Sequence, residues 1–376
     1  MKAEIISIGT ELLLGRIVNT NAAYLARKLA GLGIDLYHQT TVGDNPQRLS
    51  GALRLALGRS DAVILTGGLG PTVDDITAAT VSRLTGNGKT RIVPNRVGTA
   101  PGLVIDYRGR AIICLPGPPR ELCPMFEGYI EPILKKRYKS GWIFRTRTIK
   151  TVGLPEARVD QMMKDLLKLP PPTTVGIYAK LREVHLVIMA KAKTERLASR
   201  AIASLEKKIR ARLKNYIFGY DDETLESAVG ARLIAGKKTI AVAESCTGGL
   251  ISSRLTDVSG SSKYFIRGAV PYSNDVKVKY VGVSEDSLKK YGAVSRQVAA
   301  ELARGIRSIM DVDIGLGVTG IAGPTGGTNK KPVGLVWVAI VTDKKRIARE
   351  FRFKGTRRDI KWQASQAALD MIRSNI

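Results

Sequence analysis

The sequence predicts two α/β domains, residues 1–145 and 221–376, joined by a small α+β connector at residues 146–220. Short apolar runs alternate with segments of helical periodicity, which is typical of βαβ units around a parallel sheet. The 376 residues are enough for two or three domains that each bury a core. Near residue 146 the pattern changes, and Pro170–Pro172 interrupts the segment that follows.

Apolar runs and helical spacing place the elements of the first domain. Residues 1–9 are expected to contain the first strand rather than a signal peptide, because the apolar stretch is too short. Arg108-Gly109-Arg110 is expected to be a hairpin turn. The expected strands are residues 4–8, 35–42, 62–65, 103–107 and 111–115, and the expected helices are residues 20–30, 46–57 and 120–126.

The same reasoning places the elements of the connector and the last domain. Residues 295–310 form the clearest amphipathic helix, with Val298, Leu302 and Ile306 on one face. The other expected helices are residues 157–167, 194–213, 225–235, 249–255 and 359–372. The expected strands are residues 147–152, 175–179, 183–190, 239–243, 264–270, 314–318, 334–341 and 347–353.

The charge and composition limit the class of partner. The formal net charge is +27, but the basic residues form short dispersed clusters and aromatic residues make up only 6%. This distribution favours solvated helix faces and small anionic substrates such as nucleotides over nucleic acid as the main partner. No apolar run approaches the length of a membrane span, so no membrane partner is expected. Three cysteines do not supply a disulfide framework, so we expect a cytoplasmic protein.

The two histidines, His38 and His185, exclude several chemistries. A zinc site built from Cys and His clusters is not expected with so few ligands. Because no histidine follows residue 185, hydrolysis in the second half must proceed without a Ser-His-Asp or Cys-His arrangement.

A glycine-rich loop follows the strand at residues 62–65 and contains Gly67, Gly68 and Gly70. Glycines let backbone N–H groups approach a phosphate, and a helix N-terminus favours an anion. Asp74 and Asp75 are expected in the first turn of the next helix. There they either cap the helix or hold a divalent ion that bridges to phosphate. Taken alone, the loop is equally consistent with an ordinary turn.

A longer pattern in this domain resembles the competence/damage-inducible CinA family, whose N-terminal domain is similar to molybdopterin-binding domains of the MoaB/MogA type. The segments that carry this resemblance are residues 8–15, 19–21, 66–75, 98–102 and 115–121. The resemblance implies hydrolysis of ADP-ribose at its pyrophosphate, dependent on a divalent metal and potassium. The residues it places at this nucleotide site are Thr10, Glu11, Asn21, Gly67, Gly68 and Gly70.

One segment departs from the family pattern. Between Thr85 and Val93 the chain lacks the helical stretch and the Asn/Gln-rich segment that the family usually carries.

The last domain contains several polar and glycine-rich motifs. They are Ala243–Gly249, Gly260–Ser262, Tyr272–Lys277, Gly292–Ser295 and Val318–Gly327. A serine nucleophile needs a base, and a lysine with a lowered pKa can replace the missing imidazole.

Lys277 is the candidate base, and Ser262 and Ser245 are the candidate nucleophiles. Cys246 is a further candidate that would lack an imidazole partner. Backbone N–H groups of Thr247, Gly248 and Gly249 are expected to stabilise an oxyanion. The segment Gly320-Ile321-Ala322-Gly323 is expected to hold a substrate phosphate, with Arg357 as its charge partner. Each of these residues alone is more often a helix cap, a turn or a surface charge.

These motifs resemble the CinA C-terminal domain, which also occurs alone as nicotinamide-nucleotide amidase. The resemblance implies hydrolysis of the carboxamide of nicotinamide mononucleotide to nicotinate mononucleotide and ammonia, without a cofactor. It places the Ser–Lys pair on Ser262 and Lys277, with Ser245 and Tyr272 in support. It also implies a homodimer. Two mild departures are Pro271 before the tyrosine and Thr356 before the arginine.

Three hypotheses follow. The first is an amidase of the C-terminal domain, and the second is a metal-dependent pyrophosphatase of the N-terminal domain as a companion activity. The third, ranked last, is a nucleotide- or DNA-binding competence protein without enzymatic activity.

Overall fold

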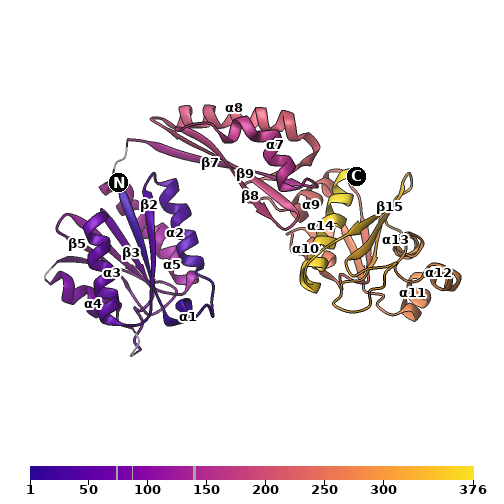
Figure 1. The fold of residues 1–376 in the computed structure, drawn as a ribbon, viewed down its shortest axis with the longest axis horizontal. Coiled ribbons are helices and arrows are strands. Elements are labelled where there is room, and N and C mark those ends of the chain that lie inside the picture. Colours follow the sequence, from indigo (N-terminus) through magenta and orange to yellow (C-terminus); the bar gives the residue numbers. More distant parts are fainter. Residues whose placement is uncertain (73–74, 87, 139–140) are drawn as a thin grey trace. The chain divides into compact units, whose positions relative to one another are not determined.

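The structure is a computed structural model that describes residues 1–72, 75–86, 88–138 and 141–376. These residues form three sheets with flanking helices, shown in sequence colours in Figure 1. The predicted fold class, two α/β domains with a small α+β connector, is confirmed. The chain divides into two compact units. One holds residues 1–146, 170–173 and 189–203, and the other holds residues 147–169, 174–188 and 204–376.

The N-terminal domain is built on a six-stranded sheet in the described residues. Its strands, in spatial order, are β2 (Asp35–Val42), β1 (Lys2–Ile8), β3 (Ala62–Thr66), β6 (Arg110–Leu115), β5 (Gly102–Tyr107) and β4 (Lys89–Val93). The pairs from β2 to β6 are parallel, whereas β6, β5 and β4 pair antiparallel. The sheet is therefore mixed. β4 lies in the stretch between residues 85 and 93, where the sequence analysis predicted no strand.

Helices cover both faces of this sheet. One face packs against α2 (Thr20–Gly31), α5 (Pro119–Met125) and α6 (Glu131–Arg137), and the other against α3 (Pro46–Arg59) and α4 (Thr77–Thr85). The Asn19 side chain caps α2 by accepting from the Ala22 N–H at 3.0 Å. A short helix α1 (Thr10–Leu13) follows β1, and a π-helix (Phe126–Ile130) lies between α5 and α6.

The connector contains a four-stranded sheet among the described residues, in the order β10 (Ile217–Tyr220), β7 (Ile143–Val152), β9 (Glu183–Ala192) and β8 (Thr173–Lys180). Two helices follow its strands, α7 (Glu156–Leu167) and the basic α8 (Glu195–Leu213). Val159, Met163 and Leu166 of α7 are buried at helical spacing, which agrees with the amphipathic pattern of that segment.

The C-terminal domain has a five-stranded sheet within the described chain. Its strands, in spatial order, are β12 (Phe265–Ala269), β11 (Ile240–Glu244), β13 (Ile314–Gly320), β14 (Leu335–Val341) and β15 (Arg346–Arg352). The pairs β12–β11 and β11–β13 are parallel, and β13–β14 and β14–β15 are antiparallel. This sheet is therefore mixed as well, whereas the sequence predicted βαβ units around a parallel sheet and a hairpin only at residues 108–110, which β5 and β6 do form.

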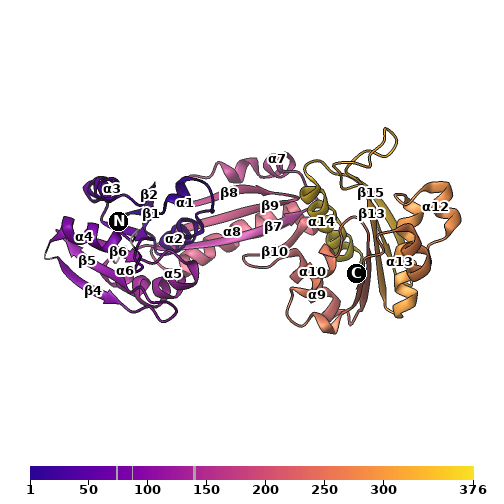
Figure 2. The ribbon, with the colours of Figure 1, turned by 90° about the horizontal axis from the view of Figure 1, so that it is seen from below.

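Two helical layers enclose this sheet, as Figure 2 shows. The helices α9 (Leu225–Ala235), α10 (Leu250–Thr256) and α14 (Arg357–Asn375) cover one face, and α13 (Arg296–Met310) covers the other. Gly315 and Gly317 of β13 allow α13 to approach closely. A Cβ on either glycine would lie 2.0 Å or 2.3 Å from a carbonyl oxygen of that helix.

Several helical features differ from the sequence predictions, and the short helices α1 and α6 are two that were not predicted. The helices α11 (Asn274–Val281) and α12 (Glu285–Tyr291) were not predicted, because each spans only about two turns and lacks a strong apolar repeat. In addition, α4 begins at Thr77, so Asp75 precedes the helix rather than lying in its first turn. Asp74 lies outside the described residues.

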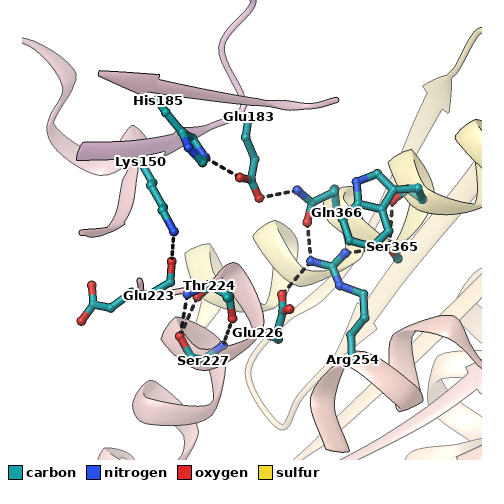
Figure 3. A network of polar contacts seen from close by, with 11 residues as sticks. Lys150, Glu183, His185, Glu223, Thr224, Glu226, Ser227, Arg254, Ser365 and Gln366 are labelled. Atoms are coloured by element: carbon teal, nitrogen blue, oxygen red, sulfur yellow. Dashed lines mark hydrogen bonds and ion pairs between the residues drawn. The ribbon is translucent and has the colours of Figure 1, made fainter. Parts of the chain in front are cut away.

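A buried polar network joins α9, α10, α14 and β9 (Figure 3). The Arg254 guanidinium donates to Ser365 Oγ (2.7 Å), Glu226 Oε2 (2.7 Å) and Gln366 Oε1 (2.6 Å). Gln366 Nε2 in turn donates to Glu183 Oε1 at 2.6 Å.

The network extends to His185, whose Nε2 lies 2.8 Å from Glu183 Oε2. Burial acts to raise the pKa of Glu183, but the hydrogen bonds from His185 and Gln366 outweigh it and the pKa is lowered. The connector strand β9 and the helices of the C-terminal domain thus share one charged network.

No helix in the described ranges is long and apolar enough to cross a membrane.

Replacement of Arg254 tests the contribution of this network to stability. Arg254→Met leaves the carboxylate of Glu226, only 17% exposed, without its partner. We expect the free energy of unfolding to fall by about 3–5 kcal/mol, because a buried charge loses its compensation. Urea unfolding followed by tryptophan fluorescence measures this loss, since the guanidinium lies 4.3 Å from the centroid of the Trp362 ring.

The matched control is Arg352→Met, which breaks an exposed ion pair with Glu350. That change should cost less than about 1 kcal/mol. Equal losses in the two variants would contradict a special contribution of the Arg254 network.

Candidate active site

The candidate active site begins where β11 ends, at the fully buried Glu244. Its carboxylate accepts hydrogen bonds from the N–H groups of Ile251 (3.1 Å) and Ser252 (2.8 Å) and from the Ser252 hydroxyl (2.7 Å). These N–H groups lie in the first turn of α10, where unpaired donors favour a negative charge. Glu244 therefore fixes both ends of the turn at residues 245–249.

Ser245 is the first residue of this turn. Its N–H donates to the Val318 carbonyl at 2.9 Å, which keeps the residue beside the end of β13. Gly248 and Gly249 have φ values of +62° and +89°, a backbone conformation that other residues seldom adopt. Within the described residues, the Ser245 hydroxyl makes no hydrogen bond, so it is available to a ligand.

Lys277 lies on α11, whose N-terminus is capped by the Ser273 side chain. The lysine is only 2% exposed, and its Nζ donates to the carbonyl oxygen of Tyr272 at 2.8 Å. No carboxylate in the described part of the chain forms an ion pair with it. Burial lowers the pKa of Lys277, and Cys246 opposes this effect weakly. An amine in this environment carries a proton less readily than a surface lysine.

Ser245 and Lys277 line one cavity with a volume of about 280 Å³. The parallel strands β11 and β13 both end at this side of the sheet, which brings the segments that follow them together. The remaining lining residues come from the turns after β11 and β12, the start of α11, the segment before α13, the end of β13 and the loop after it, and the start of α14. They are Cys246, Tyr272, Asn274, Ala293, Val294, Thr319, Gly320, Ile321, Ala322, Gly323, Thr325, Gly326 and Arg357.

Arg357 supplies positive charge at the rim of this cavity. Its Nη1 donates to the Gly323 carbonyl (2.8 Å), and its Nη2 donates to the Tyr272 hydroxyl (2.9 Å). Arg357 is the first residue of α14, which Thr356 and Asp359 cap reciprocally. The N–H groups of Ala322 and Gly323 donate to no described residue. These donors and the guanidinium can together hold an anionic group of a ligand.

Cys246 is placed in the cavity but is not suited to act as a nucleophile. The side chain is 5% exposed, and burial raises the pKa of its thiol to about 12. Only the thiolate is strongly nucleophilic, so this cysteine is inert near neutral pH.

The structure does not bring Ser262 together with Lys277, so the expected Ser262–Lys277 pair needs correction. Ser262 is exposed on a 3-10 helix (Ser261–Lys263) that precedes β12. Lys277 follows the other end of that strand. Ser262 precedes β12, whereas Ser245 and Lys277 follow the C-terminal ends of β11 and β12. Because β12 runs parallel to β11, Ser262 lies at the opposite end of these strands from Ser245 and Lys277.

A second expectation also changes. Thr247, Gly248 and Gly249 are not among the residues that line the cavity, and the Gly248 N–H already donates to the Ser245 carbonyl at 3.2 Å. The Thr247 hydroxyl is buried without a partner in the described chain. The loop at Gly320–Gly323 and Arg357 lie where the sequence analysis expected them, in the cavity with Ser245, Lys277 and Tyr272.

The N-terminal domain has its own cavity of about 360 Å³ at the ends of β1, β3 and β6. Glu11, Gly67, Gly68, Gly70 and Asp75 line it, as the sequence analysis expected.

Thr10 and Asn21 do not line this cavity, but each forms hydrogen bonds to a residue that does. Thr10 donates through its N–H (2.8 Å) and hydroxyl (2.7 Å) to Asp44 Oδ2, and Asp44 is a lining residue that the sequence analysis missed. Asn21 Nδ2 donates to the Gly117 carbonyl at 2.7 Å, and its buried Oδ1 has no partner among the described residues.

The described residues do not favour a metal at this cavity. Burial acts to raise the pKa of Asp75, but hydrogen bonds from the Thr72 hydroxyl and N–H outweigh it and the pKa is lowered. In the described ranges, no group of three or more His, Cys, Asp or Glu side chains is placed to hold an ion. The expected ligand Asp74 lies outside these ranges. We therefore assign no chemical step to a metal.

Glu244 belongs to the Ala243–Gly249 motif, but no role was predicted for it from the sequence. The signal was present, since a carboxylate just before a helix is a common N-terminal partner of backbone N–H groups. Asn274 and Thr319 were also missed as lining residues, and no spacing pattern in the sequence distinguishes them.

Three family profiles match the chain in succession. The probable molybdopterin binding domain matches residues 4–136, the damage-inducible protein CinA KH domain matches residues 146–219, and the CinA C-terminal domain matches residues 222–376. This order defines a protein with a molybdopterin-binding-type domain, a KH-type connector and a CinA-type domain.

Relatives along the full length identify the family. A competence-damage inducible protein of Caldicellulosiruptor saccharolyticus is 46% identical over 100% of this chain and 99% of its own. A CinA-like protein of Dictyoglomus turgidum is 43% identical over the same shares. A competence/damage inducible protein of known structure from Agrobacterium tumefaciens is 37% identical over 40% of this chain and 96% of its own, with a TM-score of 0.39. The chain belongs to the competence-damage inducible (CinA) family.

Alkylation tests the inert state of Cys246. At pH 8, a thiol pKa of about 12 leaves only about 10⁻⁴ of the group as thiolate. We expect iodoacetamide to leave Cys246 unmodified in the folded protein and to modify it fully in urea, as measured by mass spectrometry of peptides. Rapid modification of folded Cys246 would contradict the burial described here.

Proposed function

We propose that the C-terminal domain is an amidase that hydrolyses the carboxamide of nicotinamide mononucleotide to nicotinate mononucleotide and ammonia. The observation that carries this proposal is the buried Lys277, without a carboxylate partner in the described chain, in the same cavity as Ser245. The substrate follows from the resemblance of the motifs to nicotinamide-nucleotide amidase. The cavity of about 280 Å³ is small among ligand sites, which favours a mononucleotide over a dinucleotide.

The reaction needs one base and one nucleophile. Lys277 Nζ, as a neutral amine, takes the proton of the Ser245 hydroxyl while Oγ attacks the amide carbon. The protonated lysine then gives this proton to the amide nitrogen, the C–N bond breaks and ammonia leaves. Water attacks the resulting ester, with Lys277 again as base, and releases the carboxylic acid and the free serine.

Other cavity residues position the substrate in this proposal. The hydrogen bond from Lys277 Nζ to the Tyr272 carbonyl leaves the amine lone pair free to face the hydroxyl. Arg357 and the free N–H groups of Ala322 and Gly323 hold the phosphate. No histidine follows residue 185, so no imidazole of this domain is available as the base, and Lys277 takes that role in the proposal.

Substitution of the two central residues tests the role assignment. We expect Ser245→Ala and Lys277→Met to reduce ammonia release from nicotinamide mononucleotide by at least about 10²–10⁴-fold, the usual contribution of a positioned base. Ser262→Ala is the matched control and should retain the wild-type rate, because Ser262 lies at the opposite end of the strands β11 and β12. Loss of activity in Ser262→Ala with retention in Ser245→Ala would reverse the assignment.

The pH profile tests the state of Lys277. Because the neutral amine is the active form, kcat/KM should rise with pH and level off above the lysine pKa. Burial lowers that pKa, so the half-maximal point should lie below the ordinary lysine value of 10.5. Lys277→Arg keeps the positive charge but removes the base, and should abolish the rise of kcat/KM with pH. A profile that stays flat up to pH 10 would contradict the role of Lys277.

We propose as a second activity that the N-terminal cavity binds ADP-ribose and that its pyrophosphate is hydrolysed there; the divalent metal and potassium that the family resemblance implies are assigned to no described residue. The observation that favours a ligand there is the buried, unpartnered Oδ1 of Asn21 beside the glycine-lined cavity. These glycines allow a phosphate to approach the backbone closely.

A bulky residue at Gly68 should block this site. Gly68 has φ +64°, and a Cβ there would lie 2.6 Å from Thr77 Oγ1. We expect Gly68→Val to abolish ADP-ribose cleavage, measured with added Mg²⁺ and K⁺, and to leave ammonia release by the C-terminal domain unchanged. Gly109→Ala is the control, since that glycine also has positive φ but open space around it. Cleavage by Gly68→Val at the wild-type rate would refute the site.

A further inference from the structure

A second hollow of the C-terminal domain, the arginine groove, lies where α13 crosses the end of β14 and the start of β15. It has a volume of about 280 Å³. Arg296 and Arg304 on α13 and Arg346 on β15, together called the groove arginines, line it beside the apolar Ala300 and Val341. Val341 and Arg346 are directly opposite in the β14–β15 ladder. Three guanidinium groups from two elements therefore border one cavity that also has an apolar wall.

The groove arginines differ from two basic side chains of the same region, Arg307 and Lys345. Arg307 forms an ion pair with Asp343, and Lys345 Nζ donates to the Asn375 carbonyl at 3.1 Å. In contrast, no hydrogen bond or ion pair joins the side chain of a groove arginine to any described residue. Their charges are thus left for solvent or for a ligand.

The carboxylate of Glu301 also lines the groove but does not neutralise these arginines. It accepts hydrogen bonds from the Ser284 N–H (2.9 Å) and the Ser287 hydroxyl (2.5 Å) at the start of α12. Neutral donors therefore engage both of its oxygens, and no ion pair joins it to a groove arginine in the described chain. Three cations against one carboxylate leave a net positive field in the groove, which a bound anion would relieve.

The arginine groove is distinct from the candidate active site. Over the described residues, no side chain lines both cavities. The two are nevertheless close along the chain, because Val294 lines the active-site cavity and Arg296 lines the groove.

We propose that the arginine groove binds a phosphorylated small molecule of the nucleoside diphosphate class, at a site separate from the catalytic cavity. Guanidinium groups match phosphate oxygens with two parallel hydrogen bonds, which lysine cannot provide. Ala300, Val341 and Ile347 supply apolar surface for the sugar and base. A ligand with two phosphates engages more than one groove arginine at once.

Calorimetric titration of the full chain with ADP at low ionic strength tests this proposal. The double variant Arg304→Gln/Arg346→Gln should bind one ADP fewer than the wild type, or bind that ADP at least tenfold more weakly. The charge-matched control is Lys344→Gln/Arg349→Gln, which removes two exposed cations outside the groove lining. This control should bind ADP as the wild type does, and equal thermal unfolding of the variants verifies their fold.

A second titration uses pyrophosphate, which should bind the groove more weakly than ADP because it lacks the apolar part. The proposal is overturned if the groove variant binds ADP with unchanged number and affinity, or if the control loses as much. Equal affinities for pyrophosphate and ADP would overturn the nucleoside assignment. Binding of a DNA duplex without binding of ADP would replace this site by a nucleic-acid surface.

Discussion

The carboxylate of Glu244 is the interaction on which the C-terminal site depends. It is buried inside the domain, and its negative charge is stabilised by the first N–H groups of α10 and by a hydroxyl. The end of β11 is thereby tied to the start of that helix, and only a short turn can connect them. This turn presents Ser245 beside the loop that follows β13. The position of the hydroxyl is thus determined by a residue that does not itself line the cavity.

The environment of Lys277 provides the second half of the site. An ammonium group in a buried position normally requires a carboxylate, and none pairs with it among the described residues. The cost of burial therefore falls on the charged form and shifts the equilibrium toward the amine. Cys246 responds to the same apolar environment in the opposite sense, because burial disfavours its thiolate. One environment thus favours a neutral amine on Lys277 and a protonated, unreactive thiol on Cys246.

Periodicity predicted most helices and strands correctly, because burial imposes it on every amphipathic element. The failures are equally physical. The strand β4 is short and mostly exposed, so it lacks an apolar pattern, and periodicity does not report the direction in which β13, β14 and β15 pair. The family resemblance placed the Ser–Lys pair on Ser262 and Lys277, but the intervening strand β12 carries the chain from one end of the sheet's strands to the other. The burial of Lys277 could not be predicted, since lysine is usually exposed. Ser245, Tyr272 and the Gly320–Gly323 loop were predicted because their motifs follow strand ends.

The strand β15 ends the sheet with one side unpaired, which exposes N–H and C=O groups that could recruit a strand from another molecule. Four of its seven residues are charged, Arg346, Arg349, Glu350 and Arg352. Stacking two such strands edge to edge would bring like charges together and strip them of water. The composition of β15 therefore protects the protein from self-association into aggregates while leaving the sheet open on that side.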